Sequence, residues 1–286
     1  MAERFSCLDV LQHSGLAWRL LAGPDPAAGE IRVDGAHAAD LLHGPTAGGA
    51  AQIDLVAPST RPEASPAAAL TLCCGHSLPA MSPATTVVQV SATGSDTRQA
   101  LLMALARLMH PPVTLAGTLV RVAGAGVLLS GDSGSGKSKL ALELICRGGQ
   151  LIADDSMEAY PFDALQWAAT APALLKDYLH TAELGAINIR EVFGDSAVAP
   201  HSSIDLLVVL GQAQAARYGD DILEGHAARQ RIGEIELPAV QIVAGDPCAP
   251  TLVQTMARIT AAGIEPGAMG RTLAATQAQT MRDTQR

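Results

Sequence analysis

Eight residues decide the fold of this 286-residue chain: Gly131-Asp132-Ser133-Gly134-Ser135-Gly136-Lys137-Ser138. They fit the pattern G-x-x-x-x-G-K-[ST] at every fixed position. In such a loop the glycines allow consecutive backbone N–H groups to point inward at a phosphate. The lysine reaches the outer phosphates, and the hydroxyl of the final serine can bind Mg²⁺. The stretch therefore predicts a loop that binds the phosphates of a nucleotide.

The residues on either side of this loop have the pattern that the motif needs. Residues 126–130 are apolar and predict a buried strand, and residues 139–145 carry apolar side chains at helical spacing. Arg147 and Gly148-Gly149 then predict the end of that helix. A strand, a glycine loop and a helix in this order place the phosphates at a helix N-terminus, where the helix dipole favours anions. The alternative is a flexible Gly/Ser turn that binds nothing, and this context argues against it.

Composition and charge limit the class of protein. Of the residues, 48% are hydrophobic and only 3% are aromatic, so we expect an ample core built of Leu, Val and Ala. The net charge of −9 argues against a nucleic acid or a membrane surface as the main ligand. Because no apolar run reaches ~18 residues and residues 1–10 do not resemble a signal peptide, we expect a cytoplasmic protein without a membrane span. The five cysteines have no C-x-x-C spacing, which favours reduced thiols over a zinc site.

The length and the change in composition along the chain predict two domains. Residues 1–95 are rich in Ala, Pro, Gly and Ser, and short apolar pieces at 69–73 and 86–90 suggest strands of a small α/β domain with no recognisable chemistry. Ser95-Asp96-Thr97 can cap a helix that ends near Met109, before two prolines. Residues 96–286 form the second domain, which holds the loop. Its other expected elements are strands at 117–122, 126–130, 151–153 and 204–210, and helices at 251–262 and after Gly270.

Two adjacent carboxylates follow the strand predicted at 151–153. Asp154 and Asp155 stand at its C-terminal end, which is where ligands lie in open α/β sheets. One carboxylate can hold Mg²⁺, and the other can accept the proton of an attacking hydroxyl in phosphoryl transfer. Neighbouring side chains in a strand point to opposite faces unless a turn begins between them. The alternative is a turn or a helix cap made of aspartates.

Three segments carry a family resemblance. Residues 126–158, GVLLSGDSGSGKSKLALELICRGGQLIADDSME, closely resemble the loop–helix–strand core of bacterial HPr kinase/phosphorylase. Residues 184–194 resemble the second signature of that family, a Gly-Leu-Gly-Ile-Ile-Asn-type run that ends in Phe-Gly. Residues 115–120 resemble the strand that precedes the family's loop. The resemblance covers about residues 97–260, and the N-terminal part is similar only in position and size.

The resemblance implies a fold and an activity. It implies a catalytic domain like that of phosphoenolpyruvate carboxykinase and an ATP- and Mg²⁺-dependent kinase that phosphorylates a serine of the small phosphocarrier HPr. It also implies reverse phosphorolysis, a homo-hexamer and a phosphorelay that regulates carbohydrate metabolism. In this sequence Gly131 to Ser138 would bind the nucleotide, with Lys137 on the phosphates and Ser138 and Asp154 on Mg²⁺. The general base would be Asp155 or Asp154, with a slight preference for Asp155.

The chain departs from the family's pattern at four places. The family's histidine before the loop falls on Ala116, and its second Mg²⁺ ligand, a glutamate, falls on His180. The Arg-Gly that follows falls on Ala182-Glu183, and the late Pro-x-x-Gly-Arg segment falls on Ala244 to Pro247, without an arginine. An imidazole is a poor ligand for the hard cation Mg²⁺. Losing an arginine in phosphoryl transfer can cost a factor of ~10³–10⁵.

These departures leave three functions open. The leading hypothesis is a serine kinase whose phosphorolysis is doubtful. The second is a nucleotide-binding regulatory module that has lost catalysis, and the third is a small-molecule kinase with the same fold, which a closed pocket would favour. His180 is either a new base or ligand or a polar residue at a pocket edge. Arg190 either contacts phosphate or the protein substrate, or is exposed or paired, and Asn188 is expected to hold a turn.

Overall fold

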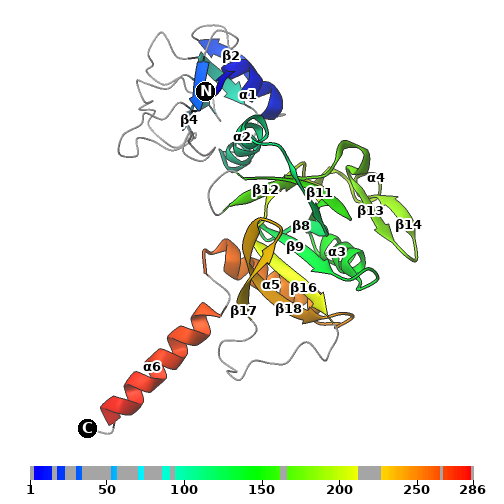
Figure 1. Ribbon diagram of the computed structural model, residues 1–286, viewed down its shortest axis with the longest axis vertical. Coiled ribbons are helices and arrows are strands. Elements are labelled where there is room, and N and C mark those ends of the chain that lie inside the picture. The colour runs from blue at the N-terminus through cyan, green and yellow to red at the C-terminus, as the bar shows by residue number, and fades with distance from the viewer. Residues whose placement is uncertain are drawn as a thin grey trace. The chain divides into compact units, whose positions relative to one another are not determined.

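The computed structural model describes residues 3–14, 18–22, 30–33, 53–56, 70–73, 86–90, 94–161, 166–211, 227–264 and 267–284 (Figure 1). The chain divides into two compact units. One consists of Met1–Val113 with Tyr160–Ala168, and the other of Thr114–Ala159 with Ala169–Arg286. The domain boundary expected between residues 95 and 96 stays a prediction.

The first unit contains short strands. Four of them form a sheet in the order β2 (Trp18–Ala22), β6 (Thr86–Val90), β5 (Leu70–Cys73) and β4 (Ile53–Val56). β2 runs antiparallel to β6, whereas β6, β5 and β4 are parallel to one another. β1 (Glu3–Ser6) pairs separately with β3 (Glu30–Val33) in antiparallel fashion. β5 and β6 lie where the sequence predicted strands.

Two helices cover the described core of the first unit, α1 (Cys7–Ser14) and α2 (Gly94–Met109). α2 ends at Met109, as predicted from Pro111-Pro112, but it begins at Gly94, so the three polar residues expected to precede it lie in its first turn. α1 and α2 bury apolar side chains together with strands β5 and β6. This core includes Val10, Leu11, Leu70, Val90, Leu101, Leu102, Met103, Leu105 and Tyr160.

The second unit is organised around a six-stranded mixed sheet. Its order is β10 (Gln150–Ala153), β8 (Thr118–Val122), β9 (Ala125–Gly131), β16 (Leu206–Gly211), β18 (Ile235–Val243) and β17 (Ala227–Ile232). β9, β16 and β18 are parallel, and the other three strands pair antiparallel with their neighbours. Val127, Leu128 and Leu129 in β9 are fully buried although they alternate between faces, so both faces of the sheet are covered at this strand.

Two helices pack against one face of this sheet, α3 (Lys137–Cys146) and α5 (Ala249–Ala261) (Figure 1). In α3 the buried positions are Leu140, Ala141, Leu144 and Ile145, the apolar stripe that the sequence predicted. They share a core with Val127 and Leu129 of β9 and with Val253 and Ala257 of α5. α3 ends where Gly148 and Gly149 donate their N–H groups to the carbonyls of Ile145 and Leu144. Packing of α3 fixes the direction in which its N-terminus points.

A second group of strands, β7 and β11 to β15, lies outside the central sheet. A four-stranded sheet has the order β15 (Ser202–Ser203), β12 (Trp167–Thr170), β11 (Ser156–Pro161) and β7 (Val113–Ala116). A hairpin of β13 (Tyr178–Thr181) and β14 (Gly185–Asn188) leads into α4 (Ile189–Phe193). The chain passes from β10 in the central sheet to β11 in this one through Asp154 and Asp155 alone. The acidic pair therefore marks the switch between two sheets.

The second unit is an α/β structure, as the sequence predicted. The strand expected at 204–210 begins later, at Leu206, and the helix expected at 251–262 begins earlier, at Ala249. The helix expected after Gly270 is α6 (Ala268–Thr284), with exposed Met269, Leu273 and Met281. None of the helices in the described ranges is both long enough and apolar enough to span a membrane.

Candidate nucleotide site

The predicted phosphate loop connects β9 to α3. Gly131, the last residue of β9, has a φ of +143°, and Gly136, which immediately precedes α3, has a φ of +91°. A Cβ at position 131 would lie 2.5 Å from the carbonyl oxygen of Leu210 in β16, so only glycine fits there. The first N–H groups of α3 have no acceptor within the helix. The loop therefore presents backbone donors at a helix N-terminus, as a phosphate site requires.

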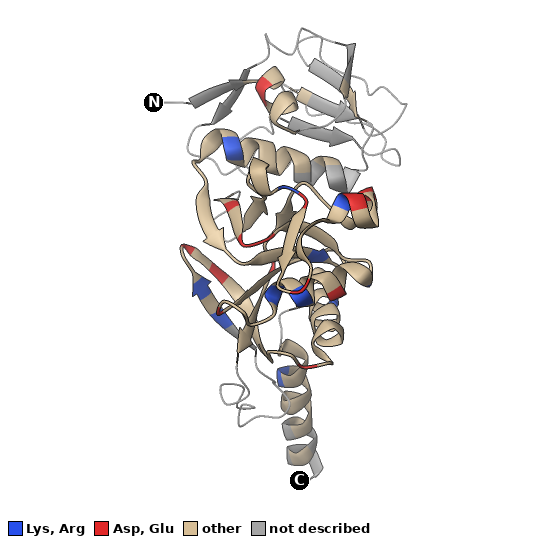
Figure 2. Cartoon of the chain, turned by 90° about the vertical axis from the view of Figure 1, so that its right-hand side faces the viewer, with Lys and Arg blue, Asp and Glu red and all other residues tan. Residues whose placement is uncertain are grey.

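Lys137 places its ammonium group over the loop. Its Nζ atom donates hydrogen bonds to the carbonyl oxygens of Gly131 and Asp132, each at 2.9 Å. Figure 2 shows acidic and basic residues interspersed over the described parts of the second unit on the side in view. In a chain with a net charge of −9, attraction for an anion at the loop comes from this ammonium, the backbone N–H groups and the dipole of α3.

A buried hydroxyl in the loop is available to a ligand. Ser135 Oγ is shielded from solvent and has no hydrogen-bond partner within the part of the chain that the structure describes. Buried polar atoms without a partner are costly, and phosphate oxygens are acceptors for a hydroxyl donor. This side chain is therefore a further feature of the loop that suits a phosphate.

Asp154 is the most highly connected residue of the site. The residue is only 6% exposed, and three donors converge on its carboxylate. Thr118 Oγ1 donates to Oδ1 at 2.6 Å, and the backbone N–H of His180 donates to Oδ2 at 2.9 Å. Ser138 Oγ lies 3.1 Å from Oδ1 and 3.3 Å from Oδ2. The structure thus brings the last residue of the loop against the first residue of the acidic pair.

Asp155 has a different environment from its neighbour. It is exposed and has a φ of +65°, a left-handed conformation that is uncommon outside glycine. Two backbone hydrogen bonds hold the turn: Gly117 N–H donates to the Asp155 carbonyl at 3.1 Å, and Ser156 N–H donates to the Asp154 carbonyl at 2.8 Å. Because β10 ends at Ala153, strand alternation does not apply to the pair. The pair forms a turn, as one of the two interpretations predicted, and that turn also separates a buried carboxylate from an exposed one.

Both carboxylates line an open pocket of about 360 Å³. The hairpin β13–β14 and the 3₁₀ turn Ala173–Leu175 supply most of its walls. Leu174 is 88% exposed, and Leu175 and Tyr178 are also exposed. The lining residues are Asp154, Asp155, Leu174, Leu175, Tyr178, Leu179, His180 and Ala186. The motifs did not predict Leu174, Leu175 and Tyr178 at the site, because these residues lie outside them.

The structure locates the positions where the chain departs from the family pattern. Ala116 is the exposed last residue of β7, next to Gly117, which holds the Asp155 carbonyl. His180 lines the pocket, and the hydrogen bond between His180 and Asp154 comes from the His180 backbone. Pro247 is exposed in the turn between β18 and α5. A methyl group and a proline ring have no proton or charge to offer a reacting phosphate.

Arg190 is paired with two carboxylates. Its Nε donates to Asp177 at 2.7 Å, and its Nη1 donates to Asp195. The hydrogen bonds with Asp177, and then with Asp195, raise the pKa of the Arg190 guanidinium above its usual range. Asn188 caps α4 by accepting a hydrogen bond from Glu191 N–H at 3.1 Å. Arg190 is therefore paired in this structure, and Asn188 holds a turn as expected.

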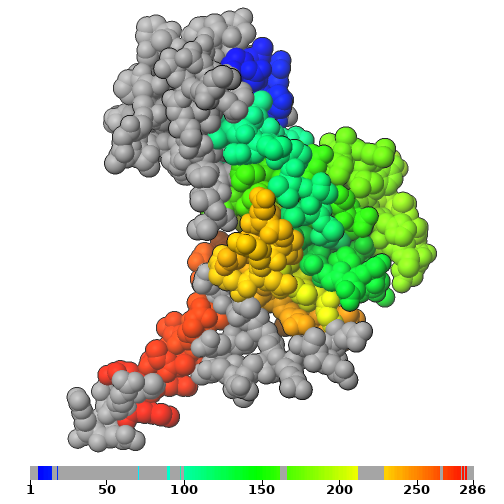
Figure 3. Space-filling model, in the orientation of Figure 1, coloured from blue at the N-terminus to red at the C-terminus, as the bar shows by residue number. Residues whose placement is uncertain are grey.

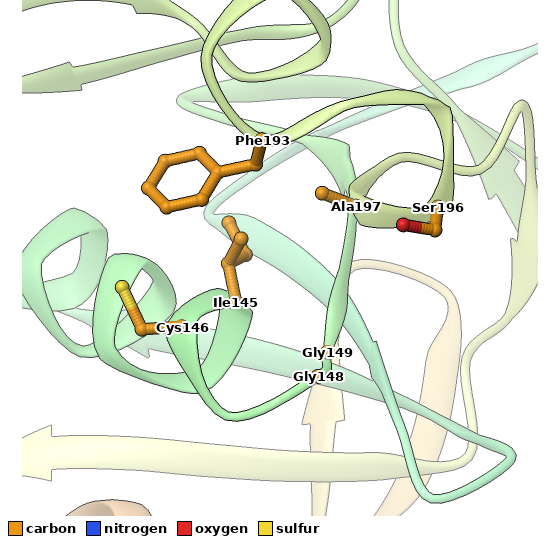
Figure 4. Close-up of a pocket in the computed structure, with 7 residues that line it drawn as sticks. All are labelled: Ile145, Cys146, Gly148, Gly149, Phe193, Ser196 and Ala197. Atoms are coloured by element: carbon orange, nitrogen blue, oxygen red, sulfur yellow. The ribbon is translucent and has the colours of Figure 1, made fainter.

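A second pocket lies at the far end of α3 from the phosphate loop. It has a volume of about 320 Å³, and Figure 4 shows Phe193 of α4 beside Ile145, near the last turn of α3. Cys146, Gly148, Gly149, Ser196 and Ala197 complete its lining. Phe193 belongs to the second signature in the sequence. The second signature therefore lies next to the C-terminal end of α3, the helix that follows the loop (Figure 4).

Thr118 is the residue of the site that sequence reasoning missed. It is fully buried, yet its hydroxyl makes the shortest hydrogen bond to Asp154. The available signal was a threonine directly after Gly117 at the start of an otherwise apolar strand. β8 lies between β9 and β10 in the sheet, which places this hydroxyl beside the end of β10.

The sequence matches the model of one protein family and is similar to the sequences of individual proteins. The model of the HPr Serine kinase C-terminal domain matches residues 107–263. The HPr kinase/phosphorylases of Stenotrophomonas maltophilia (strain K279a) and Xanthomonas campestris pv. campestris (strain B100) are each 36% identical over 140 residues. Each match spans 48% of this chain and 44% of the relative, so the chain matches less than half of the length of these proteins.

A solved structure also resembles the chain. The structure of the Hpr(Ser) kinase/phosphatase from Coxiella burnetii has a TM-score of 0.47 and 23% sequence identity. The match covers 60% of this chain and 98% of that one.

Proposed function

The chain belongs to the HPr Serine kinase C-terminal domain family, and from this premise we propose that it is an ATP-dependent protein serine kinase. It transfers the γ-phosphoryl group of ATP to a serine of an HPr-like phosphocarrier in the cytoplasm, on a fold like that of phosphoenolpyruvate carboxykinase. The observation that carries the proposal is the contact between Ser138 Oγ and the Asp154 carboxylate at 3.1 Å. It joins a phosphate loop to an acidic pair, the two parts that phosphoryl transfer requires.

The loop binds and orients the nucleotide. Its backbone N–H groups, including those at the N-terminus of α3, donate hydrogen bonds to the phosphate oxygens, and Ser135 Oγ is a further donor at the loop. Lys137 exchanges its two loop carbonyls for phosphate oxygens, since an ammonium has three donors and carries a full charge. All eight residues from Gly131 to Ser138 take part in this role.

Ser138 and Asp154 are the residues that would hold Mg²⁺. A hydroxyl and a carboxylate are hard oxygen donors, which this cation prefers, and the two side chains already lie side by side. When bound, Mg²⁺ neutralises charge on the phosphate oxygens. Thr118 and the backbone of His180 keep the Asp154 carboxylate in place while its third partner changes.

Asp155 is the proposed general base. It is exposed and lines the pocket beside Asp154, so an acceptor hydroxyl can reach it. Transfer breaks the bond between the γ-phosphorus and its bridging oxygen and forms a bond to the serine oxygen. The serine proton passes to the Asp155 carboxylate, and ADP leaves. A positioned carboxylate in this role typically contributes about 10²–10⁴-fold to the rate.

The walls of the pocket suit a protein acceptor. Leu174 and Tyr178 present large apolar surfaces to solvent beside the carboxylates, and contiguous exposed apolar surface is typical of protein contacts. Figure 3 shows the hairpin region, coloured yellow-green, at the surface in that view. A small polar acceptor would gain little from such walls. The open pocket therefore supports a protein substrate over the small-molecule kinase.

The reverse reaction is proposed to be weak or absent. Phosphorolysis needs an activated inorganic phosphate, and Ala116, His180 and Pro247 stand where the resemblance places a histidine, a glutamate and a segment with an arginine. The same three positions favour the second candidate, a nucleotide-binding regulatory module without catalysis. In that case the contacts of the phosphate loop persist and phosphoryl transfer does not occur. We expect a homo-oligomer in both cases, a hexamer by family resemblance.

One experiment separates the two candidates. The full chain is incubated with γ-labelled ATP, Mg²⁺ and a phosphocarrier from the same cell, in parallel with Lys137→Ala. Label on a phosphocarrier serine with the wild type, and none with the variant, is the expected result. Nucleotide binding by calorimetry without label transfer would sink the kinase and leave the regulatory module. Phosphorolysis is assayed separately with inorganic phosphate and phosphorylated carrier, and robust release of unmodified carrier would contradict the expected loss.

A further inference from the structure

We infer that Thr118 is a positioning residue for metal-dependent nucleotide binding, acting through the carboxylate of Asp154. The inference rests on the proposed function for the identity of the ligands, Mg²⁺ and an adenine nucleotide. Thr118 touches neither ligand directly, because it is fully buried within β8. Its hydroxyl proton goes to Asp154 Oδ1 at 2.6 Å, a short distance for a bond between two oxygens.

The three donors on Asp154 are unequal. Thr118 donates to Oδ1 at a short distance, and the His180 N–H donates to Oδ2 at a normal distance. Ser138 has a single hydroxyl proton and lies 3.1 Å and 3.3 Å from the two oxygens, so its donation is shared and long. Two donors thus fix the plane of the carboxylate, while the third partner is loosely held.

This inequality has a consequence for ligand binding. Ser138 is at the end of the phosphate loop and can turn its oxygen toward a cation at small cost. The carboxylate must keep its orientation when Ser138 turns, or both oxygens would have to be repositioned during binding. Of the two donors that remain, only that of Thr118 comes from a side chain, so residue 118 is where sequence change can loosen the carboxylate.

The backbone beside Thr118 reinforces the same assignment. Gly117 donates its N–H to the Asp155 carbonyl at 3.1 Å, so two successive residues hold two successive aspartates. Position 117 accepts only glycine, because an added Cβ would lie 2.8 Å from the carbonyl oxygen of Leu129. The close approach of this segment to β9 fixes Thr118 relative to the phosphate loop. Gly117 and Thr118 together form a clamp on the Asp154–Asp155 turn.

The test is the effect of Mg²⁺ on the affinity for ADP, which the enzyme cannot consume. Calorimetry gives the ADP dissociation constant in excess Mg²⁺ and in EDTA for the wild type, Thr118→Val and Thr118→Ser. Valine has nearly the shape of threonine without the hydroxyl, and serine keeps the hydroxyl. Partners that orient metal ligands typically contribute about 10–100-fold to metal affinity. We expect Thr118→Val to lose about tenfold or more of the Mg²⁺-dependent gain with an unchanged constant in EDTA, and Thr118→Ser to keep the gain within about threefold.

A matched control separates positioning from general stability. Thr170 is also buried, in the same unit, and its hydroxyl donates to the Pro200 carbonyl at 2.7 Å instead of to an aspartate. Thr170→Val should lower the melting temperature without changing the Mg²⁺-dependent gain. An unchanged gain in a folded Thr118→Val, or equal losses in Mg²⁺ and in EDTA, would overturn the inference.

Two further outcomes are also decisive. If Thr118→Val does not fold, Thr118→Cys replaces it, because a thiol is a weaker donor of similar size to a hydroxyl. A Thr118→Cys variant with the full Mg²⁺-dependent gain, or one that also fails to fold, would show a purely structural hydroxyl and overturn the inference. ADP binding needs no phosphocarrier, so the two proposals can fail separately. If the wild type does not phosphorylate the carrier, but Thr118→Val still lowers the Mg²⁺-dependent gain in ADP affinity, the kinase proposal fails and the inference stands.

Discussion

Ser138 Oγ lies 3.1 Å from Oδ1 and 3.3 Å from Oδ2 of Asp154, so one hydroxyl proton is shared by both oxygens of a buried carboxylate. The two residues come from different elements, the first turn of α3 and the turn that follows β10. Shorter hydrogen bonds from Thr118 and from the His180 backbone hold the same carboxylate. Ser138 is therefore the partner most easily replaced when a ligand enters.

Replacing Asp154 by asparagine tests this arrangement. Thr118, Ser138 and the His180 N–H all donate hydrogen bonds to the carboxylate. The amide NH₂ of Asp154→Asn is itself a donor, so it must face at least one of these donors without an acceptor between them. We expect the free energy of unfolding to fall by about 1–3 kcal/mol, the usual cost of an unsatisfied buried polar group. We also expect the effect of Mg²⁺ on ADP affinity to disappear. Urea denaturation and calorimetry measure the two quantities.

Ser138→Ala is the matched control for that variant. It removes the longest of the three hydrogen bonds to Asp154 and does not place two donors against each other. The free energy of unfolding should therefore change by less than about 1 kcal/mol. The Mg²⁺ effect should still be lost. Equal destabilisation by the two substitutions would contradict the ranking of the three donors.

Lys137→Ala should weaken nucleotide binding without unfolding the chain. Within the described ranges the Lys137 ammonium donates to two loop carbonyls, so stability depends little on it. Hydrogen bonds to charged groups are worth about 1.5–3 kcal/mol, which corresponds to roughly a tenfold to hundredfold loss of ATP affinity. Lys139→Ala is the control, because Lys139 is exposed two residues further along α3. Similar losses in both variants would indicate a general charge effect instead of a specific contact.

Local patterns in the sequence predicted the strand and the helix on either side of the candidate phosphate loop. The loop, the strand before it and the helix after it depend on neighbouring residues, so spacing alone predicts them. The α3 stripe, the turn at Asn188 and an α/β second unit follow from the same kind of information. Strand ends such as Leu206 differ from prediction because tertiary pairing decides where a strand begins.

The remaining contacts of the site depend on distant parts of the chain. Thr118 and Asp154 are 36 residues apart in the sequence, and their contact follows from β8 lying between β9 and β10. His180 contributes a backbone N–H, which any residue except proline supplies, so its side chain gave no indication of that role. Arg190 was ambiguous for a similar reason, since Asp177 and Asp195 become its partners only after folding.

Asp155 substitutions should separate backbone strain from chemistry. A left-handed φ costs a non-glycine residue roughly 1–2 kcal/mol, so Asp155→Gly should stabilise the chain by up to about 1 kcal/mol. Asparagine tolerates this conformation, so Asp155→Asn should leave stability unchanged. Both variants should lose about 10²–10⁴-fold in phosphoryl transfer while ADP affinity stays within about twofold. Transfer at the wild-type rate in either variant would remove Asp155 as the base and leave Asp154.

Asp205 gives a prediction about pH. Its Oδ2 accepts hydrogen bonds from Gly126 N–H and Ser203 Oγ, each at 2.7 Å, where the chain between β15 and β16 meets β9. Burial raises the pKa of the Asp205 carboxyl above its ordinary value of 3.8, against the opposing effect of these two bonds. The folded state therefore holds this proton more tightly than the unfolded state does. Its contribution to stability is complete below pH 3.8 and is lost as the pH rises through the folded pKa.

Asp205→Asn isolates that contribution. The amide oxygen can accept both hydrogen bonds and does not ionise, so the variant should lose this pH dependence and be destabilised at pH 7 by no more than about 1 kcal/mol. The advantage of the wild type over the variant should be largest in acid and should shrink as the pH rises above 3.8. Urea denaturation of both proteins from pH 3 to pH 7 measures this difference, in which contributions from other groups cancel. An advantage that grows toward pH 7 would mean that the two hydrogen bonds outweigh desolvation, with the opposite sign for the pKa shift.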